Sequence, residues 1–369
     1  MLGHPGVDGV SELRVMTVIA NPKRMQGLTL IEAMVAITIS LILLSGAITL
    51  FINNKVAYET NDNLSRLQEN ARFAIDFIIE DLRMAGYFGC RNSMDSVNNS
   101  IVAAAGDGTL EDTLNPLEGF DDSSLAWSPS GNTDTTAVNI LANTDAITVR
   151  RLSGTNVVVT DASPGQLTVE DSTGLAVNDL VGVSDCGGAD LFQITGLAGN
   201  VISHGALARE YISNGDANDS VNPIVSTFVG VRYYIGTDDN GDPALFREVL
   251  GPGIAPLQQQ LIDGVESMHI IYGVDTDNDN VPDTYVPAGD DALDSNTEWG
   301  DVIAVRLSLL MRTTRPYGDP QDVGDINYQL TDDTFVVPDD VINVPDDDTA
   351  RRYKRRVFNT TVLLRNRLT

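Results

Sequence analysis

The chain has 369 residues, 42% of them hydrophobic, and its 52 acidic residues against 23 Lys and Arg give a formal net charge of −29 at pH 7. This charge argues against a nucleic-acid-binding protein, because binding to phosphates requires clustered Lys and Arg. The length and the hydrophobic content suffice for one large or two small domains with a buried core.

An apolar stretch near the N-terminus, Leu28 to Ile52, contains one ionisable side chain, Glu32. As a helix, it is long enough to cross a hydrocarbon layer about 30 Å thick. A carboxylate in such a span costs about 2.5 to 3.5 kcal/mol, which marks Glu32 as a functional residue. Because Lys23 and Arg24 precede the stretch, the positive-inside rule places the chain beyond Ile52 in the periplasm.

Glu32 has no basic partner inside the apolar stretch. Cleavage after Gly27 would create a new α-amino group on Leu28. Glu32 of one subunit could then meet the amine of a neighbouring subunit, which would align the two helices side by side.

The segment Lys23 to Glu32 resembles the class III signal of type IV prepilins, with a basic leader, a Gly before the cut and Glu at the fifth mature position. The resemblance implies that a prepilin peptidase cleaves between Gly27 and Leu28 and methylates the new amine. Leu28 stands where the family usually has Phe. Residues 1–27 are then a leader peptide, and Met16 is an alternative start.

Two other interpretations of this stretch fit less well. An ordinary secretory signal is shorter, lacks an acid and ends in a small-x-small cleavage site, none of which applies here. A plain membrane anchor leaves Glu32 unexplained.

Apolar residues continue beyond the stretch at steps of three or four, which predicts that the same helix extends as an amphipathic one. Gly86 is a typical helix stop. We therefore expect a transmembrane half at residues 28–52 and an amphipathic half at residues 53–86. The apolar positions after the span include Leu64, Leu67, Ala71, Ile75, Ile78 and Leu82.

Residues 87–369 are expected to form a β-rich, mainly antiparallel globular domain, so that the fold class is α+β. Residues 92–140 lack a steady period and predict loop with short pieces of structure. Later apolar runs are separated by Gly, Pro, Asn and Asp, as is typical of strands and hairpins. The expected strands are 147–152, 157–160, 166–170, 180–184, 191–195, 229–235, 244–249, 265–274, 301–312 and 357–364.

The chain contains two cysteines, Cys90 and Cys186. An even number in an oxidising compartment predicts one disulfide, worth about 4.7 kcal/mol for a loop of about 100 residues on the chain-entropy model. Two unpaired buried thiols are the alternative.

Several short motifs resemble the PilW family of type IV pilus minor pilins. They are Ala85–Cys90, Ser184–Gly187, Leu261–Glu266, Tyr272–Asp277 and Leu364–Arg367. The resemblance implies a pilin-like fold and a low-abundance subunit that helps to prime pilus assembly at the inner membrane and then reaches the cell surface. Its implied partners are minor and major pilins, the prepilin peptidase, the inner-membrane assembly machinery and membrane lipid.

Two alternative functions share the same N-terminal signal. One is a tip adhesin that binds a surface through the β-rich domain, and the other is a pseudopilin of type II secretion. An enzyme is not expected: Gly182–Cys186 departs from the nucleophile-elbow pattern, and there is no phosphate-binding loop and no Cys-x-x-Cys.

Acids at the first, third, fifth and ninth positions of one loop predict a calcium site. The predicted function itself requires no cofactor. The residues are Asp275, Asp277, Asp279 and Asp283. Asn280 occupies the position usually taken by Gly, and Val286 the position of a bidentate acid. An acidic turn without metal is the alternative.

The C-terminal region is acidic from Asp332 to Asp348 and then basic from Arg351 to Arg356. We expect these charges to be solvated, because exposed ion pairs contribute only about 0 to 1 kcal/mol. A clasp between the two segments is the alternative.

Overall fold

The computed structural model describes residues 29–89, 97–100, 116–121, 141, 143–154, 156–212, 222–250, 257–293, 299–316, 328–331, 335–336 and 352–367. The predicted leader, Leu28, Cys90 and most of the acidic segment Asp332–Asp348 lie outside these residues. The chain divides into two compact units, Met1–Ala57 and Tyr58–Thr369.

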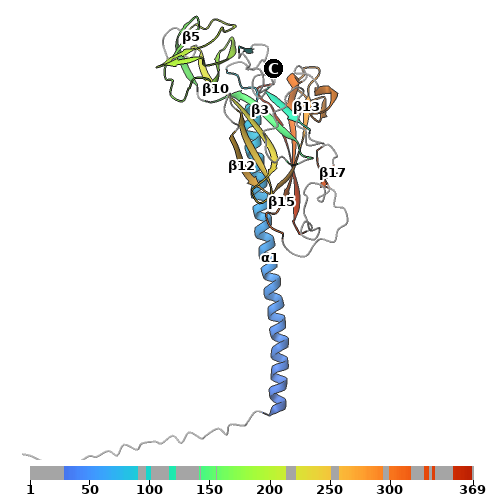
Figure 1. Ribbon diagram of the computed structural model, residues 1–369. Helices are drawn as coiled ribbons and strands as arrows, with labels where there is room; N and C mark the ends of the chain where they lie inside the picture. The colour runs from blue at the N-terminus through green and yellow to red at the C-terminus, as the bar shows by residue number, and fades with distance from the viewer. Residues whose placement is uncertain are drawn as a thin grey trace, which may run out of the picture. The chain divides into compact units, whose positions relative to one another are not determined.

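The predicted long helix is confirmed as α1 (Leu30–Met84), which is shown in Figure 1. In the part of the chain that the structure describes, α1 is the one helix long and apolar enough to cross a membrane. The structure assigns no break at the predicted division near Ile52, so the apolar and amphipathic segments belong to one helix.

Within the second unit, one face of α1 is buried. Leu67, Ala71, Ala74, Ile78 and Leu82 are at most 3% exposed and follow one another at steps of three or four residues. This spacing places them on one side of an α-helix. The two alanines allow the helix backbone to approach the strands closely.

The largest sheet has twelve strands. They are β1 (Val97–Asn99), β2 (Leu117–Phe120), β3 (Ala146–Leu152), β4 (Val157–Ser163), β5 (Gln166–Val169), β6 (Leu180–Asp185), β7 (Gly188–Gln193), β8 (Gly196–Ala198), β9 (Val201–Ser203), β10 (Ile224–Thr237), β11 (Pro243–Leu250) and β12 (Leu257–Asp263). All its pairings are antiparallel except that of β1 with β7.

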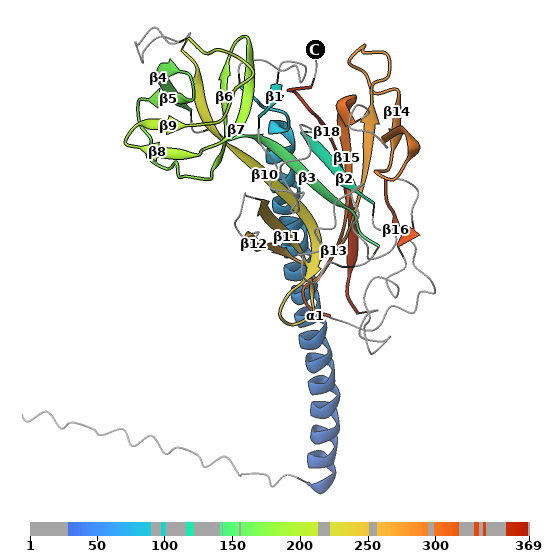
Figure 2. The same ribbon diagram turned by 45° about the horizontal axis from the view of Figure 1, so that its top comes forward.

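Strand β10 joins the parts of this sheet. Its first residues, Ile224 to Thr227, pair with β4 and β6, and its later residues pair with β3 and β11. Figure 2 shows β4, β5, β8 and β9 gathered near one end of β10 and β11 and β12 near the other. We call residues 153–223, which connect β3 to β10, the insertion lobe.

A second sheet has four strands in the order β14-β13-β15-β18. They are β13 (Val265–Val274), β14 (Thr284–Val286), β15 (Val302–Arg312) and β18 (Arg355–Leu363). The remaining described elements are the 3-10 helix η2 (Asp291–Leu293) and a small pair, β16 (Tyr328–Gln329) with β17 (Phe335–Val336). The predicted α+β class with a mainly antiparallel β-rich domain is therefore confirmed.

The two largest hydrophobic clusters of the second unit lie in different parts of it. The larger lies where the buried face of α1 meets β3, β10, β11, β13 and β15. Its members include Ile78, Tyr233 and Leu309. The insertion lobe has a core of its own, built around Phe192, Ile202 and Tyr211.

An acid on the buried face of α1 ties the helix to three adjacent strands. Asp81 is 6% exposed, accepts a 2.6 Å hydrogen bond from the Tyr233 hydroxyl and pairs with Arg151 at 3.0 Å and Arg247 at 3.6 Å. Burial, followed by the charge of Asp81, raises the pKa of Tyr233, so the phenol remains a donor. A buried carboxylate with these partners fixes the position of the helix along the sheet.

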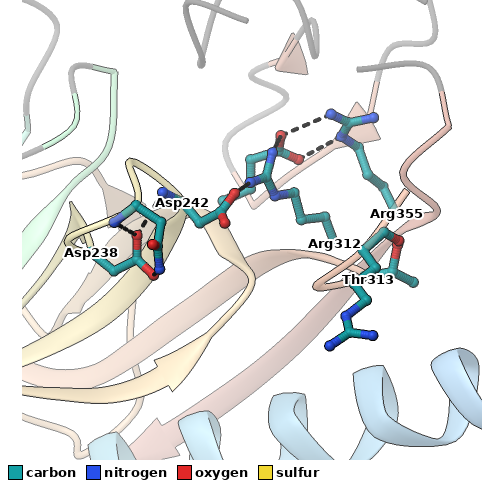
Figure 3. Close-up of polar contacts among 8 residues, drawn as sticks. Asp238, Asp242, Arg312, Thr313 and Arg355 are labelled. Atoms are coloured by element: carbon teal, nitrogen blue, oxygen red, sulfur yellow. Dashed lines mark hydrogen bonds and ion pairs between the residues drawn. The ribbon is translucent and has the colours of Figure 1, made fainter. Parts of the chain in front are cut away.

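Basic residues near the C-terminus are not all solvated, contrary to our expectation. Arg355 donates to the fully buried Glu266 at 2.5 and 2.9 Å, and its own side chain is 3% exposed. Arg312 pairs with Asp242 at 2.7 Å, in the turn that joins β10 to β11 (Figure 3). Removing Glu266 from water costs much more than an exposed pair gains, so the carboxylate is paired where strand pairing buries it.

The backbone at position 264 requires a glycine. Its φ is +79°, and a Cβ atom there would lie 2.6 Å from the carbonyl oxygen of Arg312. The Gly264 amide donates to Pro243 and its carbonyl accepts from Arg312, so it links β11 to the end of β15. A residue with a side chain would have to break this link.

We predict that Asp81→Ala lowers the free energy of unfolding by about 1 to 3 kcal/mol, because it removes the acceptor of the buried Tyr233 hydroxyl and the partner of two partly exposed arginines. Urea unfolding of the full chain in detergent, followed by tryptophan fluorescence, measures the change. Asp76→Ala on the same helix is the matched control: its pair with Arg72 is exposed, so its loss should cost less than about 0.5 kcal/mol. Equal losses in the two variants would contradict the anchoring role of Asp81.

Candidate functional sites

The first candidate site is the start of α1. The Glu32 amide donates to the Thr29 hydroxyl at 3.3 Å, and the Ala33 amide donates to the Thr29 carbonyl at 3.1 Å. Thr29 therefore caps the helix, and its spacing from Glu32 is that of a capping box, a signal present in the sequence that we did not use. The Glu32 side chain is exposed. Gly27 and Leu28, the predicted cleavage residues, lie outside the described residues.

The apolar residues that follow Glu32 are exposed in the isolated chain. They include Ile31, Ile42, Leu43 and Phe51, each about 70% exposed. An apolar surface of this extent requires lipid or other apolar helices around it. The finding fits membrane anchoring of the first unit, with Glu32 as the one acid in this exposed stretch.

The second candidate site is the acidic loop between β13 and β14. One carboxylate oxygen from each of Asp275, Asp277 and Asp283 lies within 4.8 Å of the others. Asp275 is 5% exposed, and the other two acids are exposed. Three of the four predicted ligands are thus brought together. Asp279 is not part of this group, and its Oδ1 accepts the Val281 amide at 2.8 Å.

Hydrogen bonds inside the loop position these carboxylates. Asp275 accepts the Asn280 amide at 2.8 Å, while Thr276 donates to Asp283 through its amide and its hydroxyl, at 2.8 and 2.6 Å. Asn278 and Asn280 have φ values of 61° and 67°. Asn280 therefore adopts the left-handed conformation that glycine usually supplies at this position.

Electrostatics distinguish two of the exposed acids. The negative charge of Asp279, and to a smaller extent that of Asp283, raises the pKa of Asp277. Hydrogen bonds from Thr276 lower the pKa of Asp283. The loop therefore holds Asp283 ionised and leaves repulsion at Asp277, which a bound cation would relieve. Oxygen ligands suit a hard cation such as calcium.

The predicted disulfide involves the turn between β6 and β7. There the Asp185 carboxylate accepts the amides of Gly187 and Gly188, and Arg209 binds both Asp185 and the Gly187 carbonyl. These contacts hold the turn that carries Cys186. Cys90 lies outside the described residues, so the pairing of the two cysteines stays a prediction.

The motif at the C-terminus completes the end of α1. The Asn366 side-chain amide donates to the carbonyls of Arg83 and Ala85, both at 3.3 Å, and Arg367 donates to the Trp299 carbonyl at 3.1 Å. Helix-terminal carbonyls have no partner within the helix, so these bonds satisfy them. Sequence reasoning gave Asn366 no role, because no local signal links residues so distant in the chain.

Two family models match the chain. Residues 232–366 match the family described as type IV pilus-assembly protein W, and residues 22–48 match the prokaryotic N-terminal methylation motif. The first match contains β11 to β18 and the second contains Gly27, Leu28 and Glu32. Comparison with curated proteins and with solved structures finds no match.

We predict that Cys90 and Cys186 form a disulfide in protein recovered from an oxidising compartment. Mass spectrometry after alkylation of the denatured, unreduced chain should find neither thiol labelled. Cys90→Ser, Cys186→Ser and the double variant should each lower stability by about the same 2 to 5 kcal/mol, because each removes the same link. Two labelled thiols in the unreduced chain would contradict the pairing.

Proposed function

We propose that this chain, a PilW-like pilin of the type IV pilus, is a minor pilin that helps to prime pilus assembly once prepilin peptidase has cut between Gly27 and Leu28. The observation that supports this role is a helix start with one acid, Glu32, at the head of an exposed apolar surface. Such a surface suits lateral contact with other pilin helices inside the membrane.

Glu32 has a defined task in this proposal. Thr29 caps the helix through its hydroxyl, so the helix start is ordered without using the carboxylate of Glu32. That carboxylate then pairs with the α-amine of Leu28 on a neighbouring pilin. An ion pair inside lipid is strong enough to set the register of two helices, because neither charge has water as an alternative partner.

The remaining partners follow from the family and the location. The apolar part of α1 lies in the inner membrane before assembly, and the unit that begins at Tyr58 lies in the periplasm. Other minor pilins, the major pilin and the inner-membrane assembly machinery act on the processed subunit there. The mature subunit then moves to the pilus at the cell surface.

We predict that Glu32→Gln leaves the protein in the membrane but lowers its amount in sheared pili by about tenfold or more, as loss of one ion pair in lipid implies. Quantitative immunoblots of membranes and sheared pili measure the ratio. Asp62→Asn on the same helix is the control, because its pair with Arg66 is exposed and its loss should not change the ratio. Normal recovery of Glu32→Gln in pili would refute the docking role.

We further propose that the loop Asp275–Asp283 binds calcium through Asp275, Asp277 and Asp283. The supporting observation is the approach of their oxygens to within 4.8 Å of one another. Calcium would stabilise the connection between β13 and β14 by removing the repulsion at Asp277. The cation would therefore have a structural role next to the large core.

Addition of millimolar calcium to the full chain in detergent should raise its melting temperature, because a ligand that binds only the folded state stabilises it. Asp277→Asn should abolish the rise, yet it should not lower the melting temperature in calcium-free buffer, since it removes repulsion. The rise should also shrink as the pH falls through the raised pKa of Asp277. An unchanged melting temperature in the native chain would refute calcium binding.

A further inference from the structure

The insertion lobe contains a cavity of about 790 Å³, lined by residues 161–165, 167, 204–207 and 209–212. One wall is the hairpin that joins β4 to β5, and the other is the segment after β9. Both walls lie outside the two segments that match known families. The cavity is within the size range of binding sites for small molecules, and therefore large enough for one long side chain.

Hydrogen bonds from β7 and from the β4–β5 turn hold the segment after β9 in place. Buried Asp190 on β7 accepts the Arg209 amide at 3.2 Å and the Tyr211 hydroxyl at 2.9 Å. The His204 amide donates to the Gly165 carbonyl at 3.0 Å, which ties this wall to the β4–β5 turn. The cavity is therefore formed by fixed parts of the lobe.

The cavity combines an apolar floor with acidic walls. Ala162 and Leu207 pack against the lobe core, are partly exposed and line the cavity. Asp161 and Glu210 line it from opposite walls, and among the described residues neither carboxylate has a basic partner. The one cation in the lining, Arg209, is already paired with Asp185 at 3.2 Å. The site thus has an excess of two negative charges.

We propose that this cavity binds a lysine-containing peptide segment of a partner protein. The ammonium group would lie between Asp161 and Glu210, and the aliphatic stem would cover the floor formed by Ala162 and Leu207. The overall charge of −29 favours the approach of cationic partners. The apolar floor distinguishes lysine from an amino sugar, which carries an equal charge but has no aliphatic stem.

This binding role goes beyond the assembly role and does not depend on it. The cavity residues belong to the insertion lobe, whereas the assembly role uses Glu32 and the start of α1. Variants of the cavity should therefore enter sheared pili as the unaltered chain does, and failure of one proposal leaves the other standing.

Fluorescence anisotropy of a dye-labelled penta-lysine peptide, titrated with the full chain in detergent, tests the proposal. We expect saturable binding that weakens about tenfold in Asp161→Asn/Glu210→Gln. The matched control, Asp239→Asn/Glu170→Gln, removes the same two charges from exposed positions outside the cavity and should weaken binding less than about twofold.

Two further probes examine the stem. Penta-diaminobutyrate carries the same charge on side chains two methylenes shorter and should bind more weakly than penta-lysine, by about fivefold or more. A five-unit glucosamine oligomer should compete poorly. Equal weakening in the two double variants, equal binding of the shorter peptide, stronger binding of the sugar, or no saturable binding of penta-lysine would each overturn the proposal.

Discussion

Packing of one face of α1 against the strands is the constraint on which the second unit depends. The same small set of side chains, from Leu67 to Leu82, contacts β-strands of two sheets, so neither sheet has a complete core without the helix. Asp81 fixes the position of α1 along the strands. Apolar surfaces alone would allow the helix to shift, whereas a buried carboxylate with three partners does not.

The helix and the central strands could be predicted from the sequence because each carries its own period. Steps of three or four marked α1, and alternation marked β13 and β15, whose inward residues such as Leu307 and Leu309 are fully buried. Strand β12 was missed because its first four residues are exposed and include three glutamines, so no alternation distinguishes it. The buried Arg355 was also missed, since a run of charges carries no sign of which one meets Glu266.

The acidic loop and the ends of α1 show the same limit at the level of sites. Spacing alone predicted Asp275, Asp277 and Asp283 as ligands, because all three lie in one short loop. It could not predict that the Asp279 side chain would accept the Val281 amide. Thr29 could have been predicted from its spacing to Glu32. Asn366 could not, because its partners at Arg83 and Ala85 are joined to it by folding alone.

The bonds between Asn366 and the end of α1 affect the order in which the second unit can fold. A ribosome makes α1 before it makes the segment that contains β18 and Asn366. Until that segment is made, the carbonyls at the end of α1 lack the bonds from Asn366, and β15 lacks its neighbour β18. The second unit therefore cannot close before this segment has been made, and shorter intermediates leave apolar strand surface exposed to aggregation.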